Sequence, residues 1–365
     1  MTSSNKLSIA GFFAGAGGLD LGFKNAGFSV PYANEYDKSI WATYEHNFPK
    51  TQLDKRSIVE ISPEDIPEVT GYVGGPPCQS WSEAGAARGI DDYRGQLFFE
   101  YLNLIDANRP AFFMAENVSG ILFPKHSAAF RRILGGFLNL GYNVSYGLVR
   151  ASNFGVPQDR DRVFIIGYRT DLGVIFKPPA EFDTLPTLKD AIWDLRKGAL
   201  PAAGGETNGE KLKVLNHEYM TGSFSTIFMS RNRVRSWDEP SFTIQAGARH
   251  APLHPQAPKM NHVGRDLFEF KKGSEDLYRR LSVREAARVQ TFPDDFEFKY
   301  SRITDGYKMI GNAVPVKLAE VFAKIIMKDL QSIAIPNRKK LQKGELLTFA
   351  ELKAAEKEPL ILVTA

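Results

Sequence analysis

The alternation of strand-like and helical patterns over residues 7–170 constrains the fold more than any other feature of this chain. Short apolar runs, such as LSIAGFF at 7–13 and AFFMAEN at 111–117, are separated by segments with helical spacing, such as 38–47 and 126–140. This alternation is typical of parallel sheets, because parallel neighbours need a crossover connection that is usually helical. We therefore expect an α/β fold with a doubly wound, mostly parallel sheet.

The alternation of strand-like and helical patterns stops in residues 171–279, where Pro and Gly are frequent and Arg and His are concentrated. We expect a second, smaller, irregular or β-rich domain there. Helical patterns return at 282–289, which a capping-box sequence opens, and at 314–330. Residues 1–170 and 280–330 are therefore expected to form one domain, and residues 331–365 an appended extension with a helix at 346–355.

Composition excludes several classes of protein. Hydrophobic residues make up 43% of the chain and charged residues 24%, which is typical of a folded soluble domain. No apolar run approaches the 18 residues of a membrane span. The single cysteine, Cys78, excludes an intramolecular disulfide and a cysteine-based zinc site, no metal-ligand spacing occurs, and a reducing cytoplasm is expected.

The net charge of +4 decides little, but residues 221–262 carry five Lys and Arg against two Asp and Glu, with three of the six histidines. A polyanion is one explanation for this segment, and a solvated loop face is the other.

A glycine-rich turn, FAGAGG at 13–18, follows the first predicted strand and opens a helix. The dinucleotide fingerprint is not met, because its third glycine is replaced by Asp20. Glu35 lies 20 residues after Gly15 at the end of the next strand, where a carboxylate accepts hydrogen bonds from ribose hydroxyls. This pattern suits a nucleoside cofactor without phosphates, such as S-adenosyl-L-methionine, or a purely structural turn.

The cysteine lies in a second loop, GGPPCQS at 74–80, just past a predicted strand. The two prolines stiffen this loop, and the carboxyl end of a parallel strand is where such sheets place their chemistry. A lone cysteine is more often a buried filler, but Cys78 on a rigid loop is a candidate nucleophile.

Six motifs occur in order between residues 7 and 328. They resemble those of the cytosine C5 DNA methyltransferases: FAGAGG at 13–18, PCQ at 77–79, ENV at 116–118, QDRDR at 158–162, REAARVQTFP at 284–293 and GNAVP at 311–315. Four further stretches look closest to bacterial modification enzymes that act on GGCC: ANEYDKSIW at 33–41, the segment 74–92, TIFMSRNRVRSW at 226–237 and LHPQAP at 253–258.

The resemblance implies roles for four catalytic residues. Cys78 would attack C6 of the cytosine, and Glu116 would protonate N3 and contact the exocyclic amine. Arg162 would hold O2, and Arg160 would support the cysteine loop or a phosphate. Without this context, Glu116 would be an ordinary strand-end carboxylate and the arginines surface ion-pair partners.

The resemblance also implies a cofactor site. Its residues would be Phe13, Gly15, Gly17, Leu19, Glu35, Tyr36, Ser57, Ile58, Pro77, Leu97, Asn312 and Ala313. Ser57 stands where the family usually has Asp, a stronger acceptor for the adenine amino group, so we expect cofactor binding weaker by about 1 kcal/mol.

The target cytosine must be flipped out of duplex DNA, which makes residues 171–279 the expected reader. Arg231, Arg233 and Arg249 are expected to read guanine, and Arg235 to meet phosphate. Residues 243–244 fit the small dipeptide at the core of the family's reader. GGCC is the leading expectation, although residues 245–252 differ from the pattern of the GGCC enzymes.

The resemblance therefore implies a metal-free DNA (cytosine-5-)-methyltransferase of a restriction–modification system. It would be a cytoplasmic, bacterial monomer that uses S-adenosyl-L-methionine and releases S-adenosyl-L-homocysteine. Its partner would be double-stranded DNA, which it protects from a cognate restriction endonuclease. Two alternatives remain, an RNA cytosine methyltransferase and a non-catalytic DNA-binding protein with a vestigial cofactor fold. A nicotinamide oxidoreductase is disfavoured by Asp20.

Overall fold

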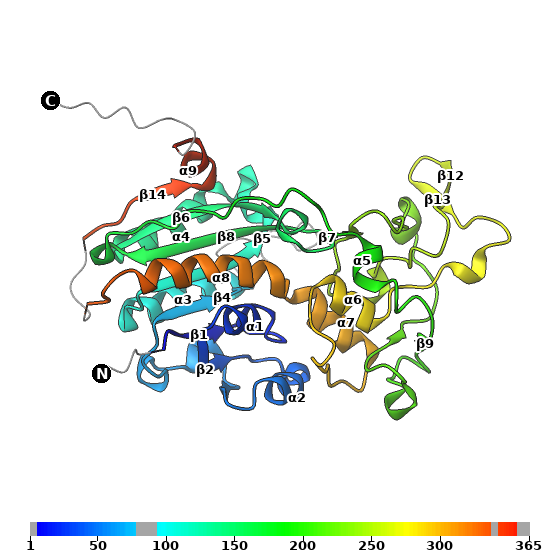
Figure 1. The fold of residues 1–365 in the computed structure, drawn as a ribbon, viewed down its shortest axis with the longest axis horizontal. Coiled ribbons are helices and arrows are strands. Elements are labelled where there is room, and N and C mark those ends of the chain that lie inside the picture. The colour runs from blue at the N-terminus through cyan, green and yellow to red at the C-terminus, as the bar shows by residue number, and fades with distance from the viewer. Residues whose placement is uncertain (1–5, 78–92, 337–341, 356–365) are drawn as a thin grey trace.

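A central eight-stranded sheet organises the protein (Figure 1). The computed structural model describes residues 6–77, 93–336 and 342–355, so Cys78 lies outside the described residues. The strand order is β14-β6-β8-β5-β4-β1-β2-β3, in which only β8 runs antiparallel to its neighbours. The strands are β1 (Ser8–Phe12), β2 (Ser29–Asn34), β3 (Gln52–Asp54), β4 (Gly71–Gly74), β5 (Phe112–Val118), β6 (Tyr142–Arg150), β8 (Asp161–Arg169) and β14 (Leu346–Thr348).

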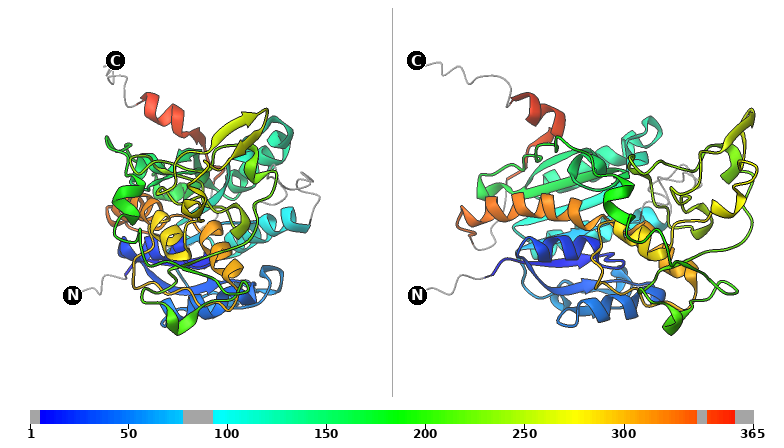
Figure 2. Two further views of the ribbon diagram at one scale, coloured as in Figure 1. Left: turned by 90° about the vertical axis from the view of Figure 1, so that its right-hand side faces the viewer. Right: turned by 45° about the vertical axis from the view of Figure 1, so that its right-hand side comes forward.

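Helices cover both faces of this sheet, because its central strands are apolar on both sides (Figures 1 and 2). Phe112 of β5 packs in one core with α1 (Gly18–Asn25) and α8 (Val316–Gln331). The adjacent Phe113 faces the other core, where it stacks on Phe137 of α4 (Ser127–Asn139) beside α3 (Tyr93–Asn108). The prediction of a doubly wound, mostly parallel sheet is confirmed.

Residues 171–279 form short elements beside the carboxyl edge of the sheet, at the right of Figure 1. They are α5 (Leu188–Ile192), β9 (Leu200–Pro201), β10 (Glu218–Tyr219), β11 (Ser241–Phe242), β12 (Asn261–Gly264) and β13 (Leu267–Glu269), and β11 pairs with β7 (Gln158–Asp159). Within the described residues, the part around 224–278 is the stretch of this region that has an apolar cluster of its own.

The rest of this region shares its core with the main domain. Ile192 and Ile244 pack with Tyr44 of α2 (Lys38–Asn47) and with apolar residues of α6 (Val283–Val289) and α7 (Ile303–Asn312). Apolar contacts therefore cross the predicted boundaries at 171 and 279, and the division into two domains stays a prediction.

The C-terminal extension completes the sheet. Residues 346–348 form a strand, so the expectation of a helix from residue 346 is wrong for its first turn: α9 begins at Phe349 (Phe349–Ala355). The reason is a reciprocal cap, in which the N–H of Thr348 donates to Glu351 Oε2 and the N–H of Glu351 donates to Thr348 Oγ1. Among the described residues, no helix combines the length and apolar character needed to cross a membrane.

Candidate functional site

The predicted site residues gather at the carboxyl edge of the parallel strands. The glycine-rich turn follows β1, Glu35 follows β2, the loop leading to Cys78 follows β4, and Glu116 lies near the end of β5. Because β5, β4, β1 and β2 are neighbours, these four segments lie side by side at one edge. That is the edge at which open α/β sheets bind ligands.

Glu116 and Arg162 form an ion pair at this edge. Arg162 Nε lies 2.8 Å from Glu116 Oε1, and the two side chains are 14% and 10% exposed, so water screens the pair little. The pair is close because β5 and β8 are antiparallel and Val118 pairs with Arg162.

Glu116 also lies against the loop that leads to Cys78. A Cβ on Gly75 would fall 3.3 Å from Glu116 Oε2, and Asn117 Nδ2 donates to the carbonyl of Pro76 at 3.2 Å. A side chain at position 75, three residues before the cysteine, would therefore crowd the Glu116 carboxylate, and glycine leaves that space free.

Arg160, predicted to support the cysteine loop or a phosphate, is 1% exposed. Its guanidinium donates to the carbonyls of Ile244, Gly311 and Ala313 at 2.9–3.0 Å. It thereby joins the predicted reader segment to the GNAVP loop. Support of the cysteine loop by Arg160 stays a prediction, because that loop lies outside the described residues from position 78 on.

The glycine-rich turn has one tightly packed side and one open side. Gly17 has φ 87° and a Cβ there would meet the ring of Phe48 at 2.3 Å. At Gly15, with φ +55°, a Cβ would meet no atom of the residues that the structure describes within 4 Å. Gly17 is thus required by packing, whereas Gly15 leaves room for a ligand to approach the backbone.

Asp20, the residue that breaks the dinucleotide fingerprint, is 1% exposed and accepts a hydrogen bond from Tyr44 Oη at 2.7 Å. Burial raises the pKa of Asp20 to about 7, against the smaller opposing effect of the Tyr44 hydroxyl. The carboxyl therefore ties α1 to α2 below the turn.

Glu35 lies beside the glycine-rich turn and accepts a hydrogen bond from its backbone. Its Oε2 accepts from the N–H of Gly15 at 2.8 Å and its Oε1 from the N–H of Asp37 at 2.7 Å. Burial raises the pKa of Glu35, although the two backbone N–H groups act in the opposite direction. The adjacent Tyr36 is 70% exposed and offers an aromatic face. A carboxylate with unused lone pairs, an open glycine and an exposed ring fit a nucleoside.

The other predicted cofactor residues are placed in different ways. Leu19 and Ile58 are core residues, at 7% and 4% exposure. Ser57 opens a 3-10 turn, and its N–H donates to Glu60 Oε2 at 2.9 Å. Asn312 is exposed and Ala313 buried, while three half-buried residues complete the set: Phe13, Pro77 and Leu97.

The four predicted DNA-contacting arginines divide into two pairs. Arg231 and Arg249 are exposed. Arg233 is 9% exposed, and its guanidinium donates to the carbonyls of Phe228 and Ile227, both at 2.8 Å. It braces the loop that carries Arg231, so its reading of a base stays a prediction.

Arg235 is the other engaged arginine. It forms ion pairs with Asp159 at 2.7 Å and Glu239 at 3.1 Å, and its guanidinium lies over the ring of Phe242. As placed here, Arg235 fastens the reader to β7, and its contact with a phosphate also stays a prediction.

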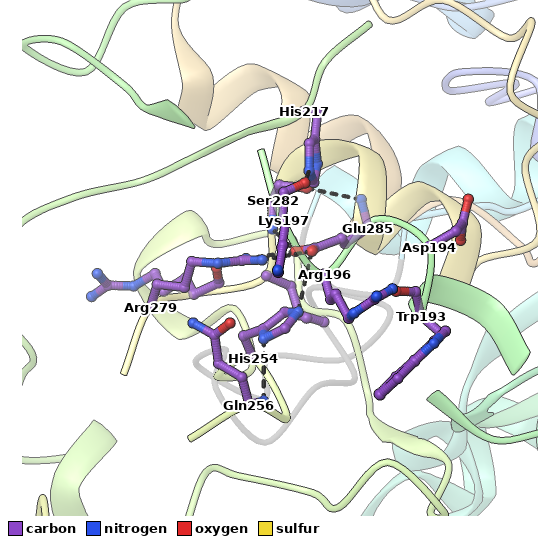
Figure 3. A network of polar contacts seen from close by, with 12 residues as sticks. Trp193, Asp194, Arg196, Lys197, His217, His254, Gln256, Arg279, Ser282 and Glu285 are labelled. Carbon is purple, nitrogen blue, oxygen red and sulfur yellow. Dashed lines mark hydrogen bonds and ion pairs between the residues drawn. The ribbon is translucent and has the colours of Figure 1, made fainter. Parts of the chain in front are cut away.

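Sequence reasoning missed a buried polar network where the reader meets α6 (Figure 3). Arg279 holds both oxygens of Glu285 at 2.7 Å, and His254 Nε2 lies 3.3 Å from Glu285 Oε1. His217 Nδ1 lies 2.9 Å from Ser282 Oγ. The hydrogen bonds from Arg279 and His254 hold the pKa of Glu285 well below its usual range despite complete burial. The SVRE capping box was the only sequence signal, and it revealed Ser282 and Glu285 without their long-range partners.

Among the described residues, no three His, Cys, Asp or Glu side chains are grouped so that they could hold a metal ion.

Comparison with known proteins connects this site to one family. The profile of the C-5 cytosine-specific DNA methylases matches residues 7–328. The chain is 54% identical over 327 residues to the Type II methyltransferase M.MthTI of Methanothermobacter thermautotrophicus, covering 90% of this chain and 99% of the relative. It is 53% identical over 336 residues to the Type II methyltransferase M.NgoPII of Neisseria gonorrhoeae, covering 90% and 98%.

Solved structures resemble the fold at low sequence identity. The Entamoeba histolytica methyltransferase EhMeth superimposes with a TM-score of 0.64 at 16% identity, covering 90% of this chain and 99% of that one. A variant of Spodoptera frugiperda DNMT2 gives a TM-score of 0.62 at 19% identity, covering 88% and 99%. These similarities show a shared architecture.

Proposed function

Because the chain belongs to the C-5 cytosine-specific DNA methylase family and is a DNA (cytosine-5-)-methyltransferase, we propose that it methylates a cytosine within GGCC in duplex DNA. The methyl donor is S-adenosyl-L-methionine, and the modification protects DNA from a cognate restriction endonuclease. The enzyme works as a monomer in the cytoplasm. The observation that carries this proposal is the Glu116–Arg162 pair, which lies next to the loop leading to Cys78, at the same edge of the sheet as the glycine turn.

The proposed chemistry begins at Cys78. C5 of cytosine is a poor nucleophile, so the Cys78 thiolate adds to C6 and forms a sulfur–carbon bond. Glu116 donates a proton to N3 as electron density moves into the ring. C5 then takes the methyl group, which leaves S-adenosyl-L-homocysteine as the second product. The C5 proton leaves to a base, the N3 proton returns to Glu116, and the sulfur–C6 bond breaks. This restores the aromatic ring and the free thiolate.

Arg162 has two roles in this scheme. Its Nε holds Glu116 Oε1, which fixes the carboxyl group at the sheet edge. Its guanidinium also carries further N–H donors, one of which already donates to the carbonyl of Asp161. An N–H group aimed at O2 of the everted cytosine would stabilise the negative charge that accumulates there as sulfur adds.

The cofactor, when bound, supplies a methyl group activated by a sulfonium. Glu35 would hold the ribose hydroxyls and Tyr36 would stack on the adenine, since the first is a strand-end carboxylate and the second an exposed ring. The open side of Gly15 would admit the methionine portion. Residues 312–313 would close the pocket from α7.

Sequence recognition is assigned to residues 171–279, with Arg231 and Arg249 as the exposed base readers. An arginine can hold O6 and N7 of guanine with two parallel hydrogen bonds, which suits a site rich in guanine. Support for GGCC comes from the similarity of residues 226–237 and 253–258 to the GGCC enzymes.

The direct test incubates the purified protein with tritiated S-adenosyl-L-methionine and a duplex that contains one GGCC site. We expect label on the inner or outer cytosine of GGCC and resistance of the product to an endonuclease that cleaves GGCC. A duplex with 5-fluorocytosine in place of the target should give a covalent adduct with the wild type and none with Cys78→Ala. If the protein binds S-adenosyl-L-methionine in the absence of DNA but transfers no label to any duplex, the proposed activity is refuted.

A further inference from the structure

Two glutamine side chains meet at the junction between the reader and the cofactor side. Gln158 opens β7, and Gln290 follows the last residue of α6. Both are 0% exposed. The Nε2 of Gln158 donates to Oε1 of Gln290 at 2.8 Å, although the two residues are 132 positions apart.

The remaining atoms of this amide pair point in opposite directions. Gln158 Oε1 accepts from the N–H of Ile244 at 2.8 Å. Gln290 Nε2 donates to the carbonyls of Ile310 at 2.8 Å and Ala313 at 3.1 Å. One directed series of hydrogen bonds therefore runs from the reader backbone to the end of α7. Turning either amide over would place N–H against N–H or oxygen against oxygen, so the order is fixed.

The backbones on the two sides are also in direct contact. A Cβ on Gly311 would fall 2.3 Å from the nitrogen of Ala246 and 2.3 Å from the carbonyl carbon of Gln245. Ala246 belongs to the segment 244–249, which ends at the exposed Arg249, three residues further along. Because neither backbone has room to yield, a shift of the strip at 244–249 must be accompanied by a shift of the loop at 311–313.

We propose that the Gln158–Gln290 pair couples recognition of the DNA target to binding of the methyl donor. This inference rests on the proposed function, because it requires Arg249 at the DNA and residues 312–313 at the cofactor. Both glutamines are positioning residues, since neither needs to touch a ligand. Ordering one side by a ligand orders the other through the buried amides. By linkage, DNA then raises cofactor affinity by the same factor by which cofactor raises DNA affinity.

The experiment measures the Kd of S-adenosyl-L-homocysteine by calorimetry, without DNA and with a saturating GGCC duplex. For the wild type we expect the duplex to tighten binding by about tenfold, within the usual range of coupling between sites. Gln290→Met keeps the length of the side chain and removes its three hydrogen bonds. We expect its ratio of Kd values to fall to about threefold, because the Arg160 hydrogen bonds and the Gly311 contact still join the two segments, with the DNA-free Kd changed by less than about threefold.

A double-mutant cycle tests whether the two residues act as a unit. Gln158→Met should lower the ratio as Gln290→Met does, and the double variant should lower it no further. Asn108→Leu is the matched control, since Asn108 Nδ2 donates to the Pro63 carbonyl and to Tyr72 Oη away from the junction. It should keep the wild-type ratio.

Three outcomes would overturn the inference: a wild-type ratio retained by Gln290→Met, a wild-type ratio of one with both ligands bound, or a strictly additive cycle. A wild type that binds no S-adenosyl-L-homocysteine would instead refute the proposed function.

Hydrogen exchange on the wild type is a second test of the proposed coupling, and it needs neither a variant nor DNA. S-adenosyl-L-homocysteine alone should slow amide exchange in residues 241–250. Unchanged exchange there, with slower exchange at the glycine turn, would also overturn the coupling.

Discussion

At the scale of the residue, the site depends on side chains that are held by few, well-defined partners. Glu116 is held by Arg162 through Oε1, while its Oε2 lies on the side of Gly75, where a Cβ would fall 3.3 Å away. In the proposed reaction, a carboxyl group that is held in this way before a base arrives would need little reorganisation.

The first prediction concerns this carboxyl group. Glu116→Gln keeps the size of the side chain but removes its ability to transfer a proton. We expect kcat to fall by about 10²- to 10⁴-fold, with little change in the Kd of S-adenosyl-L-homocysteine. Single-turnover methylation and calorimetry measure the two quantities. A kcat within threefold of the wild type would exclude Glu116 as the acid.

The second prediction concerns Ser57, a hydroxyl in place of the family's carboxylate. Ser57→Asp should tighten cofactor binding by about 1 kcal/mol, or about fivefold in Kd, because a charged acceptor makes a stronger hydrogen bond. Ser62→Asp is the matched control, since Ser62 also precedes a 3-10 turn and its N–H also donates to an acidic side chain. Equal effects of the two changes would contradict the assignment.

The third prediction follows from the pKa of Asp20, which burial raises to about 7. The folded state therefore holds this proton more tightly than the unfolded chain does. Its contribution to stability is complete below about pH 4 and is lost as the pH rises to about 7. Asp20→Asn, which still accepts from Tyr44, should match the wild-type Tm near pH 4 and exceed it increasingly toward pH 7. Parallel Tm profiles for the two proteins would rule this out.

At the scale of the element, the parallel strands determine where function can be placed. Each of β1, β2, β4 and β5 ends at the same edge, so four loops far apart in sequence converge there. The C-terminal extension contributes the outermost strand of this sheet, next to β6 and far from β1 and β2 in the strand order. β14 pairs with β6, and Phe349 covers Gly147, where a Cβ would fall 2.4 Å from its ring.

The fourth prediction tests that extension. Phe349 is 6% exposed and lies near the rings of Phe176 and Phe322. Phe349→Ala should lower the free energy of unfolding by about 3 kcal/mol through lost burial and a cavity. Glu351→Ala, which removes only the exposed reciprocal hydrogen bond to Thr348, should cost clearly less than Phe349→Ala. Chemical denaturation measures both. If Phe349→Ala cost no more than the cap variant, the extension would not be an integral part of the core.

At the scale of the whole molecule, residues 171–279, the predicted reader, are joined to the rest of the protein by polar groups as well as by a shared apolar core. Glu285 of α6 is held by Arg279 and His254 from the reader side (Figure 3). Burial lowers the pKa of both His254 and His217, although Glu285 acts in the opposite direction on each. The polar network around Glu285 therefore contains two imidazoles, His217 and His254, that burial keeps neutral.

The fifth prediction is that the network around Glu285 makes the free energy of unfolding fall at acid pH. The unfolded chain takes up protons on these histidines below about pH 6.5, whereas the folded protein resists it, so stability is lost as the pH falls below that value. The lowered pKa of Glu285 extends the loss below about pH 4.5. His254→Gln should reduce the decline between pH 6.5 and 5, measured by denaturant unfolding at each pH. Replacement of the exposed His262, which faces solvent on β12, is the control and should leave the decline unchanged. An unaltered decline in His254→Gln would remove this histidine from the explanation.

The sequence by itself determined the sheet, its cofactor-side loops and the family. These features depend on local patterns: strand–helix alternation, glycine turns, capping boxes and short motifs whose order is read along the chain. Glu35 could be proposed as a site residue because the end of a parallel strand is a predictable place, whereas Glu116 could be proposed only because the ENV motif at 116–118 resembles that of the family.

Tertiary structure decided what depends on contacts between distant positions. Nothing near Gln158 in the sequence indicates that its amide meets Gln290, 132 residues away. Nor could sequence separate the exposed Arg231 from Arg233, two positions later, which packs against backbone carbonyls. Periodicity reports which face of an element is apolar. Which polar groups pair inside the protein is decided by how the elements are assembled, because a buried donor must find its acceptor wherever the fold places one.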